Sequence, residues 1–248
     1  MTGGALGEVT EALERGDNET VLRLTETILA ERPGDDAAHE LRARALLALG
    51  RIDEAEQHVQ DAVRLDPDEV RYRELLAQVL SREGAHREAA AEYGRLARND
   101  PRLGEWTVAE AEERLGAAEA RQSVEAARRA VQLDPRNGRA QLALSRALAR
   151  VGDARGAFTA AGAATRLLGG LPEAREALAD ALWLADEDRR AFDEFRALAL
   201  EARGADRARV TQKARTLYRQ SGGWVRRLIA GITPLFEIGF RSGWLDVA

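Results

Sequence analysis

Cysteine is absent from the 248-residue chain, which excludes disulfides and thiolate metal sites. Aromatic residues make up only 5% of the sequence, which disfavours a β-sandwich and suits helices packed through alanine and leucine. The first residues lack a basic segment followed by an apolar run, so we expect no signal peptide and a cytoplasmic protein. With 45% hydrophobic and 32% charged residues, the chain is expected to fold rather than remain disordered.

Lysine is nearly absent too, since Lys213 is the only one and arginine supplies the other positive charges, a bacterial-like composition typical of a GC-rich genome. The net charge is −5. Residues 206–248 contain eight positive and three negative side chains, so this segment carries +5 and the residues before it −10. An acidic body followed by a basic tail is a charge asymmetry that points to an interaction.

Proline is rare, but four prolines are evenly spaced by 34 residues: Pro33, Pro67, Pro101 and Pro135. Small residues follow the same period at two further places in each unit. The eighth position holds Val9, Ala43, Ala77, Ala111, Ser145 and Ala179, and the twentieth holds Val21, Ala55, Ala89, Ser123, Ala157 and Ala191. Because small side chains let two helix axes approach closely, each unit is predicted to be a pair of packed helices whose apolar faces are buried by stacking.

The turns of each unit carry their own signals. Glycines at the fifteenth position (Gly16, Gly50, Gly84 and Gly152) are expected to end the first helix in the left-handed conformation. Asp17, Asp53 and Asp153 are expected to cap the second helix, and Asp53 with Glu56 has the spacing of a capping box. Unit four departs from this pattern because Gly116 comes two residues early, which predicts a longer turn. Unit six has Asp186 in place of the glycine and Arg203 in place of the proline, and Gly204 is expected to end its second helix.

These residues resemble the tetratricopeptide repeat family, most specifically in units two, three and five; the segment Leu47-Ala48-Leu49-Gly50 with Ala55 and Pro67 is the best single match. The resemblance covers residues 2–205 as six units: 2–35, 36–69, 70–103, 104–137, 138–171 and 172–205. It implies an all-α fold, a right-handed α-solenoid of stacked helix-turn-helix repeats. Residues 206–221, with Val210, Ala214, Leu217 and Ser221 on one face, are expected to form a C-terminal capping helix, followed by an apolar and basic tail over 222–248.

In this family the first helices of the units line a concave groove, so the resemblance also implies a partner-binding surface. The expected groove residues are Arg44, Arg71, Gln78, Arg82, Arg139, Arg146, Arg150 and Trp183, with an acidic end at Glu173, Glu176 and Asp180. Arginines bind carboxylates through two hydrogen bonds, which favours an acidic or C-terminal peptide. Alternatively, these arginines pair with Glu40, Glu74 and their neighbours. The asparagines that the family uses to clamp chaperone tails are missing at the required positions, which disfavours that class of cochaperone.

The tail carries an apolar stripe beside two arginines: Trp224, Leu228, Ile232, Leu235 and Phe236, with Arg226 and Arg227. Its uncharged run over 228–236 is nine residues, too short for a membrane span of ~20 residues. Such a surface is not expected to remain exposed. It folds back on the repeats, docks on another copy or a partner, or lies on an anionic membrane surface.

Catalytic and phosphate-binding motifs are missing: there is no Gly-x-x-x-x-Gly-Lys, Gly-x-Gly-x-x-Gly or His-Glu-x-x-His sequence. The three histidines, His39, His58 and His86, occupy unrelated positions of their repeats and are expected to be ordinary surface or groove residues. We therefore expect no enzyme activity, cofactor or metal, and no nucleic-acid binding, because aromatics are not interleaved with the arginines. The sequence predicts a protein-binding adaptor or scaffold, or alternatively a peripheral membrane-associated assembly factor anchored by its tail at the inner face of the membrane.

Overall fold

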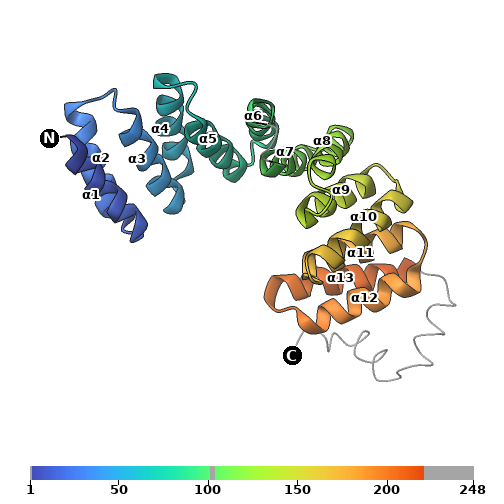
Figure 1. Ribbon diagram of the computed structural model, residues 1–248. Helices are drawn as coiled ribbons and strands as arrows, with labels where there is room; N and C mark the ends of the chain where they lie inside the picture. The colour runs from blue at the N-terminus through green and yellow to red at the C-terminus, as the bar shows by residue number, and fades with distance from the viewer. Residues whose placement is uncertain (1, 101–103, 221–248) are drawn as a thin grey trace. The chain divides into compact units, whose positions relative to one another are not determined.

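The computed structural model describes residues 2–100 and 104–220, which form thirteen α-helices (Figure 1). The helices are α1 (Thr2–Glu14), α2 (Asn18–Glu31), α3 (Asp36–Ala48), α4 (Ile52–Leu65), α5 (Val70–Glu83), α6 (His86–Asn99), α7 (Gly104–Gly116), α8 (Ala120–Leu133), α9 (Gly138–Arg150), α10 (Ala154–Leu167), α11 (Pro172–Leu184), α12 (Asp188–Glu201) and α13 (Gly204–Gln220). The predicted all-α class is confirmed. None of these helices is long and apolar enough to cross a membrane.

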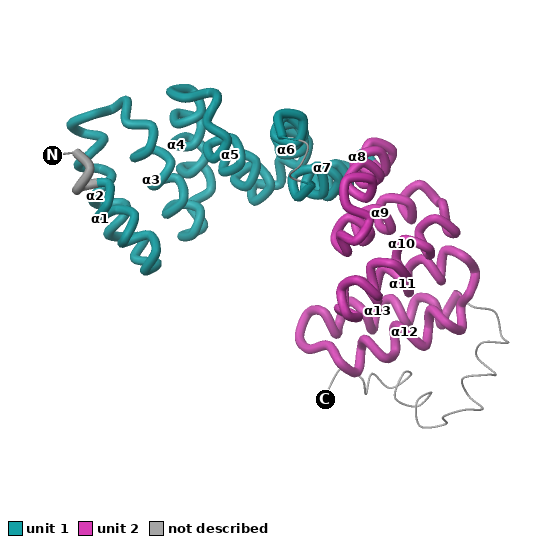
Figure 2. Tube along the Cα trace, in the orientation of Figure 1, with its two compact units in different colours: residues 1–119 teal, residues 120–248 magenta. Residues whose placement is uncertain are grey.

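The chain divides into two compact units, residues 1–119 with α1–α7 and residues 120–248 with α8–α13 (Figure 2). Within each unit, successive helices pack against one another. The first helices of the repeats begin at intervals of 34 residues, at Thr2, Asp36, Val70, Gly104, Gly138 and Pro172. The predicted apolar and basic residues of the tail, 222–248, lie outside the described residues, as does Ser221.

Small side chains fill the helix contacts, as the repeat predicts. In the first unit Ala43, Ala55 and Ala77 are fully buried, and in the second unit Ala157 and Ala179 are as well. Larger residues pack around them, for example Leu46, Val59 and Phe195, all with no exposed surface. Val210, Ala214 and Leu217 are buried on α13, so the predicted apolar face of the helix after the repeats is confirmed.

The left-handed turns are confirmed at all four predicted glycines, where φ lies between +72° at Gly16 and +88° at Gly84. The longer turn predicted in the fourth repeat, residues 104–137, is wrong. Ala118 takes the left-handed conformation instead (φ +60°), at the same repeat position as the four glycines. Asp186 does so in the sixth repeat (φ +58°). The position in the repeat therefore determines this backbone conformation, even where an L side chain makes it costly.

Gly116 is explained by close packing rather than by a turn. It is the last residue of α7, and a Cβ atom there would lie 2.8 Å from Cγ of His86 on α6. The residue is small because another side chain comes close, and the turn begins after it. Gly204 also differs from its prediction, because α12 ends at Glu201 and Gly204 begins α13.

The helix caps follow the prediction at two of three aspartates. Asp17 accepts a hydrogen bond from the backbone N–H of Thr20, and Asp153 accepts one from Gly156. The cap predicted at Asp53 is wrong, because α4 begins one residue earlier and Asp53 lies inside its first turn. The predicted capping box is wrong for the same reason, and Glu56 instead accepts a hydrogen bond from Gln60.

Candidate functional site

In the first compact unit, residues 1–119, the predicted groove residues lie on the first helix of each repeat, which we call the first-helix face. Most of the arginines on this face form an ion pair with a nearby carboxylate. Arg44, Arg71, Gln78 and Arg82 are all exposed. Arg44 pairs with Glu40, which lies one turn earlier on α3 and is buried. Arg71 pairs with Glu69 at 3.2 Å at the start of α5. Two of the three arginines of this face therefore already have a carboxylate partner, one of them the Glu40 that the sequence offered as an alternative.

The corresponding face of the second unit is different. Arg139, Arg146 and Arg150 on α9 are exposed, and none of the three side chains forms a hydrogen bond or ion pair with another residue in the described part of the chain. They are 7 and 4 residues apart, so at 3.6 residues per turn they lie within about 40° of one another around the helix. Together they form a row of arginines, which we call the α9 arginine row.

The acidic residues of α11 face α13, the second helix after it in the chain. Glu176 pairs with Arg209 and, at 2.8 Å, with Lys213, while Asp180 pairs with Lys213 at 2.6 Å. Burial would raise the pKa of Glu176, but hydrogen bonds from Lys213 and Arg209 outweigh it and lower the pKa. For Asp180 burial dominates, and its pKa is raised despite Lys213. The α11 carboxylates are thus largely neutralised by α13. The charge of Arg146 also acts on Asp180 and opposes, without reversing, the rise of its pKa that burial causes.

Trp183, also predicted as a groove residue, is partly buried and packs inside the second unit. Its ring lies edge-on to Phe195 of α12, with the ring centroids 6.2 Å apart. The ammonium group of Lys213 lies 5.7 Å from the centroid of the same Phe195 ring. The structure therefore gives Trp183 a role in holding α11 against α12.

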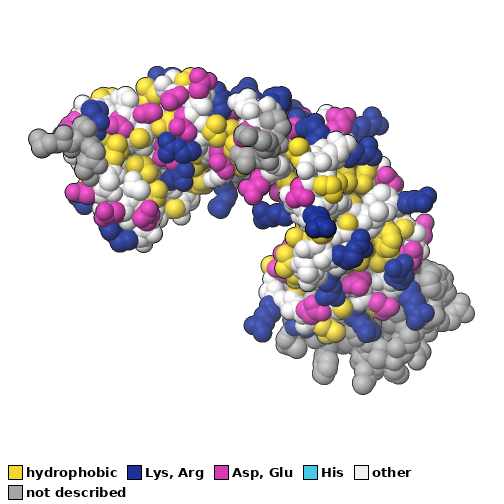
Figure 3. Space-filling view, in the orientation of Figure 1, with side chains coloured by type: hydrophobic (Ala, Val, Ile, Leu, Met, Phe, Trp, Pro, Cys, Tyr) yellow, Lys and Arg dark blue, Asp and Glu magenta, His cyan; other side chains and the backbone are white. Residues whose placement is uncertain are grey.

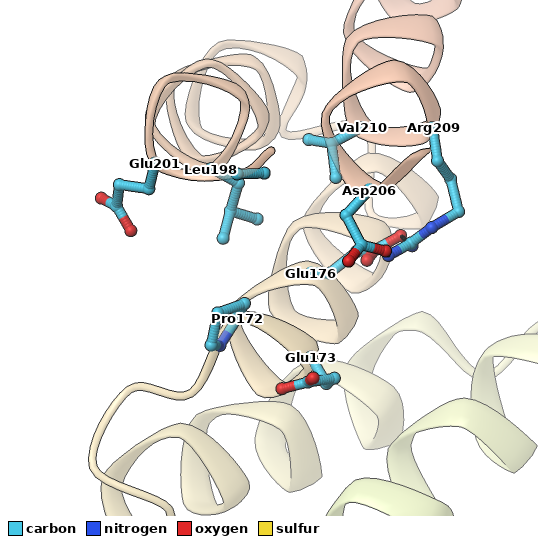
Figure 4. Close-up of a pocket in the computed structure, with 9 residues that line it drawn as sticks. Pro172, Glu173, Glu176, Leu198, Glu201, Asp206, Arg209 and Val210 are labelled. Atoms are coloured by element: carbon cyan, nitrogen blue, oxygen red, sulfur yellow. Dashed lines mark hydrogen bonds and ion pairs between the residues drawn. The ribbon is translucent and has the colours of Figure 1, made fainter. Parts of the chain in front are cut away.

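A pocket of about 160 Å³ lies where α11, α12 and α13 meet (Figure 4). Its lining combines apolar and charged residues: Pro172, Glu173, Glu176, Leu198, Glu201, Ala202, Asp206, Arg209 and Val210. Most of its carboxylates are paired, because Arg209 bonds to Glu176 and to Asp206 (3.0 Å), and Glu201 accepts from Arg175 at 2.7 Å. The pocket is consequently a small, mostly neutralised hollow beside the first-helix face.

One cluster in the first unit resembles part of a catalytic triad in composition. Glu113 on α7 accepts a hydrogen bond from Ser81 at 2.6 Å and contacts Nδ1 of His86 at 2.7 Å. The carboxylate lies between the serine and the histidine, so the histidine is not placed to take the serine proton, as a nucleophile would require. These contacts connect α5, α6 and α7 rather than form a reactive centre.

The surface of both units mixes the two signs of charge, with arginines and carboxylates interleaved on the face shown in Figure 3. The sequence did not predict which of these pair. Several pairs join residues 32 or 33 positions apart, such as Arg209 with Glu176 and Arg87 with Glu119. Opposite charges separated by nearly one repeat length are the signal that could have found them.

Comparison with known proteins gives a consistent result. Residues 12–79 match the family model described as tetratricopeptide repeat. The fold is similar to the crystal structure of a tetratricopeptide repeat protein from Parabacteroides merdae, with a TM-score of 0.73 and 12% identity over 88% of this chain and 91% of that one. It is also similar to MamA from Desulfovibrio magneticus RS-1, with a TM-score of 0.59 and 20% identity over 67% of this chain and 92% of that one.

A third similar structure is YrrB, described as a tetratricopeptide repeat protein with an unusual peptide-binding site, with a TM-score of 0.55 and 16% identity over 70% of this chain and 90% of that one. No curated protein matches the sequence at a significant level. The matched repeats and the paired helices at 34-residue intervals agree with the residues that carry the resemblance. Residues 12–79 therefore carry tetratricopeptide repeats, and the described part of the chain has the fold of tetratricopeptide repeat proteins.

Proposed function

We propose that the protein is a protein-interaction scaffold and that the α9 arginine row binds the carboxylates of an acidic segment of its partner. The observation that carries this proposal is the difference between the two units. Arginines of the first unit are held by Glu40 and Glu69, whereas the three arginines of α9 are exposed and have no ion pair among the described residues. A guanidinium that forms no ion pair is available for a bidentate contact with a carboxylate.

The similar structure of YrrB, which is described with a peptide-binding site, supports a peptide as the ligand. At 1.5 Å per residue, Arg139 and Arg146 are separated by ~10 Å along α9, and Arg146 and Arg150 by ~6 Å. An extended peptide advances ~3.3 Å per residue. Because alternate side chains of such a peptide share one face, acidic residues at every second position present carboxylates ~6.6 Å apart, close to the Arg146–Arg150 separation. A segment with acidic residues at every second position is therefore the kind that we expect the row to bind.

The test uses a fluorescently labelled peptide with glutamates at every second position and a second peptide with lysines in their place. We expect the glutamate peptide alone to bind, and its affinity to fall as salt is added, because exposed charges are screened. Replacing Arg139, Arg146 and Arg150 together by Glu should weaken binding at least tenfold, since each exposed pair contributes ~0.2–1 kcal/mol and the new charges repel the peptide.

A matched control makes the same change of charge elsewhere in the unit. Arg121, Arg155 and Arg189 are the second residues of α8, α10 and α12, and all three are exposed. Their joint replacement by Glu should leave the affinity within about twofold of the wild type at 150 mM salt, where charges farther apart than ~8 Å are largely screened. Equal weakening in both triple variants, or no binding of the glutamate peptide by the wild type, would show that the α9 row is not the site.

A further inference from the structure

His39 and His58 occupy unrelated positions of their repeat in the sequence, but in the structure they lie in contact between α3 and α4. Their Nδ1 atoms are 3.0 Å apart. His39 is buried and His58 is partly buried, so the expectation of an ordinary surface or groove histidine is wrong for His39. Asp61 also lies near, with Oδ2 3.8 Å from Nδ1 of His39. Two histidines and a carboxylate are residue types that ligate metal ions. The directions of their hydrogen bonds decide whether this cluster can bind one.

Arg42 fixes these directions, because a guanidinium only donates hydrogen bonds. Its Nε donates to Nε2 of His58 at 3.0 Å, so that nitrogen must carry a lone pair. A neutral His58 therefore holds its proton on Nδ1 and donates it to Nδ1 of His39. His39 in turn holds its proton on Nε2, which donates to the backbone carbonyl of Pro33 at 3.0 Å. Each of the four ring nitrogens then has one complementary partner.

A metal ion does not fit this arrangement. An ion bound to Nδ1 of His58 would force the ring proton onto Nε2, directly opposite the Nε–H of Arg42. Arg42 is itself held in place, because it donates to the carbonyl of Leu22 at 2.8 Å and to the hydroxyl of Thr25 at 3.3 Å. A ligating histidine instead needs an acceptor opposite its second nitrogen, and only His39 has one.

We infer that His39, His58 and Arg42 form a proton-sensitive junction that joins α3 to α4 only while both histidines are neutral. A proton added to His58 at Nε2 would face the Arg42 donor, and a proton added to His39 at Nδ1 would face the donor of His58. Either proton replaces a hydrogen bond with two opposed N–H groups and adds a positive charge beside the guanidinium. Acidification is therefore expected to loosen this repeat of the first unit.

The charged groups around the pair do not reverse this expectation. From α4, Asp61 and Glu54 favour a protonated His58, but Asp61 pairs with Arg64 at 2.6 Å and Glu54 with Arg51 at 2.6 Å. Burial, followed by Arg42 and His39, outweighs them and lowers the pKa of His58 below its ordinary 6.5.

The other packed elements present paired or neutral groups. Near the start of α3, Arg32 pairs with Asp35 at 2.7 Å, and on α1 Arg15 pairs with Glu11. From α5, the hydroxyl of Tyr72 donates to Asp36 at 3.0 Å. From α2, only the carbonyl of Leu22 and the hydroxyl of Thr25 reach Arg42.

The sign of the pH effect follows from the lowered pKa. A histidine that is harder to protonate when folded binds more protons in the unfolded chain, so stability rises with pH. The full stability is present above about pH 6.5, the ordinary histidine pKa, and is lost as the pH falls below it. For each unit by which folding lowers the pKa, the folding equilibrium constant decreases about tenfold at acidic pH.

Ring-nitrogen NMR of the full-length protein tests the junction directly. The three histidines are assigned from single His→Gln variants. At pH 7.5 we expect His58 protonated on Nδ1 and His39 on Nε2, with the titration midpoint of His58 below 6.5. His58 protonated on Nε2, or a midpoint at or above 6.5, would overturn the inference. So would a stoichiometric change of both ring signals on addition of one equivalent of Zn²⁺.

Urea unfolding supplies the second readout. In a His86→Gln background, His39 and His58 are the only histidines left. The unfolding midpoint of this protein should fall more between pH 7.5 and 5.5 than that of a variant in which all three histidines are Gln. An equal decrease in the two proteins would contradict the inference, and the NMR measurement remains decisive if the triple variant does not fold.

Discussion

Gly116 offers a sharp test of the packing between α6 and α7. A Cβ atom at this position would lie 2.8, 2.9 and 3.0 Å from Cγ, Nδ1 and Cδ2 of the His86 ring. The ring would have to move, and its contact with Glu113 at 2.7 Å would be lost. A lost hydrogen bond costs ~0.5–1.5 kcal/mol, or ~1.5–3 kcal/mol with a charged group. Alanine regains at most ~1 kcal/mol through its helix propensity, so we expect Gly116→Ala to destabilise the protein by ~0.5–2 kcal/mol.

Thermal unfolding measures this effect, since 1 kcal/mol shifts the midpoint of a chain of 150–250 residues by roughly 2–4 °C. Gly7→Ala is the matched control, because nothing lies within 4 Å of its added Cβ; it should be neutral or raise the midpoint. In a His86→Ala background the Gly116→Ala change should also become neutral or stabilising. The reasoning fails if Gly116→Ala raises the midpoint as Gly7→Ala does, or if removing the ring does not change its effect.

Four further changes, in two matched pairs, test other parts of the structure. Ala55→Leu adds bulk at a fully buried helix contact and should destabilise the protein by ~1–3 kcal/mol. Its control, Ala48→Leu at an exposed position of α3, should change stability by less than ~0.5 kcal/mol. Equal urea midpoints of the two variants would contradict the packing at Ala55. Asp153→Ala should cost ~1 kcal/mol through loss of its cap, and Asp53→Ala should cost clearly less because it caps nothing, which denaturant midpoints can compare.

The repeat period was predictable from the sequence because it depends on local features. Prolines and small residues recur at fixed intervals, and a helix pair of this length buries them against its neighbours. The prediction failed in the fourth repeat, where Gly116 was taken to end the helix and Ala118 adopts the left-handed conformation instead. The left-handed conformation follows the position in the repeat, whatever residue stands there. The small size of Gly116 is explained only by the approach of His86.

For the candidate site, the sequence predicts which residues share the first-helix face but not which of them form ion pairs. Arg139, Arg146 and Arg150 were expected on it from their repeat positions, and the structure finds them exposed. Whether an arginine forms an ion pair, as Arg44 does with Glu40, depends on which side chains of neighbouring turns and helices come within reach. Such contacts depend on tertiary packing and rotamers, which a repeat pattern does not specify.

The histidine junction shows the same limit more strongly. His39 and His58 are 19 residues apart, a separation with no meaning in the 34-residue period. They meet because they lie on the facing sides of two helices of one repeat. A helical projection of α3 against α4 could have suggested their contact, but not the direction of each hydrogen bond, which follows from Arg42.

The most direct test of the proposed scaffold function is to locate a bound acidic peptide. A photo-crosslinking group placed beside the glutamates of the peptide described above, followed by mass spectrometry, identifies the helices that it touches. The account predicts crosslinks concentrated on α9 and α11, suppressed by high salt and by the triple Arg→Glu variant of α9. Crosslinks concentrated on α8, α10 or α12, or unchanged in that variant, would contradict it.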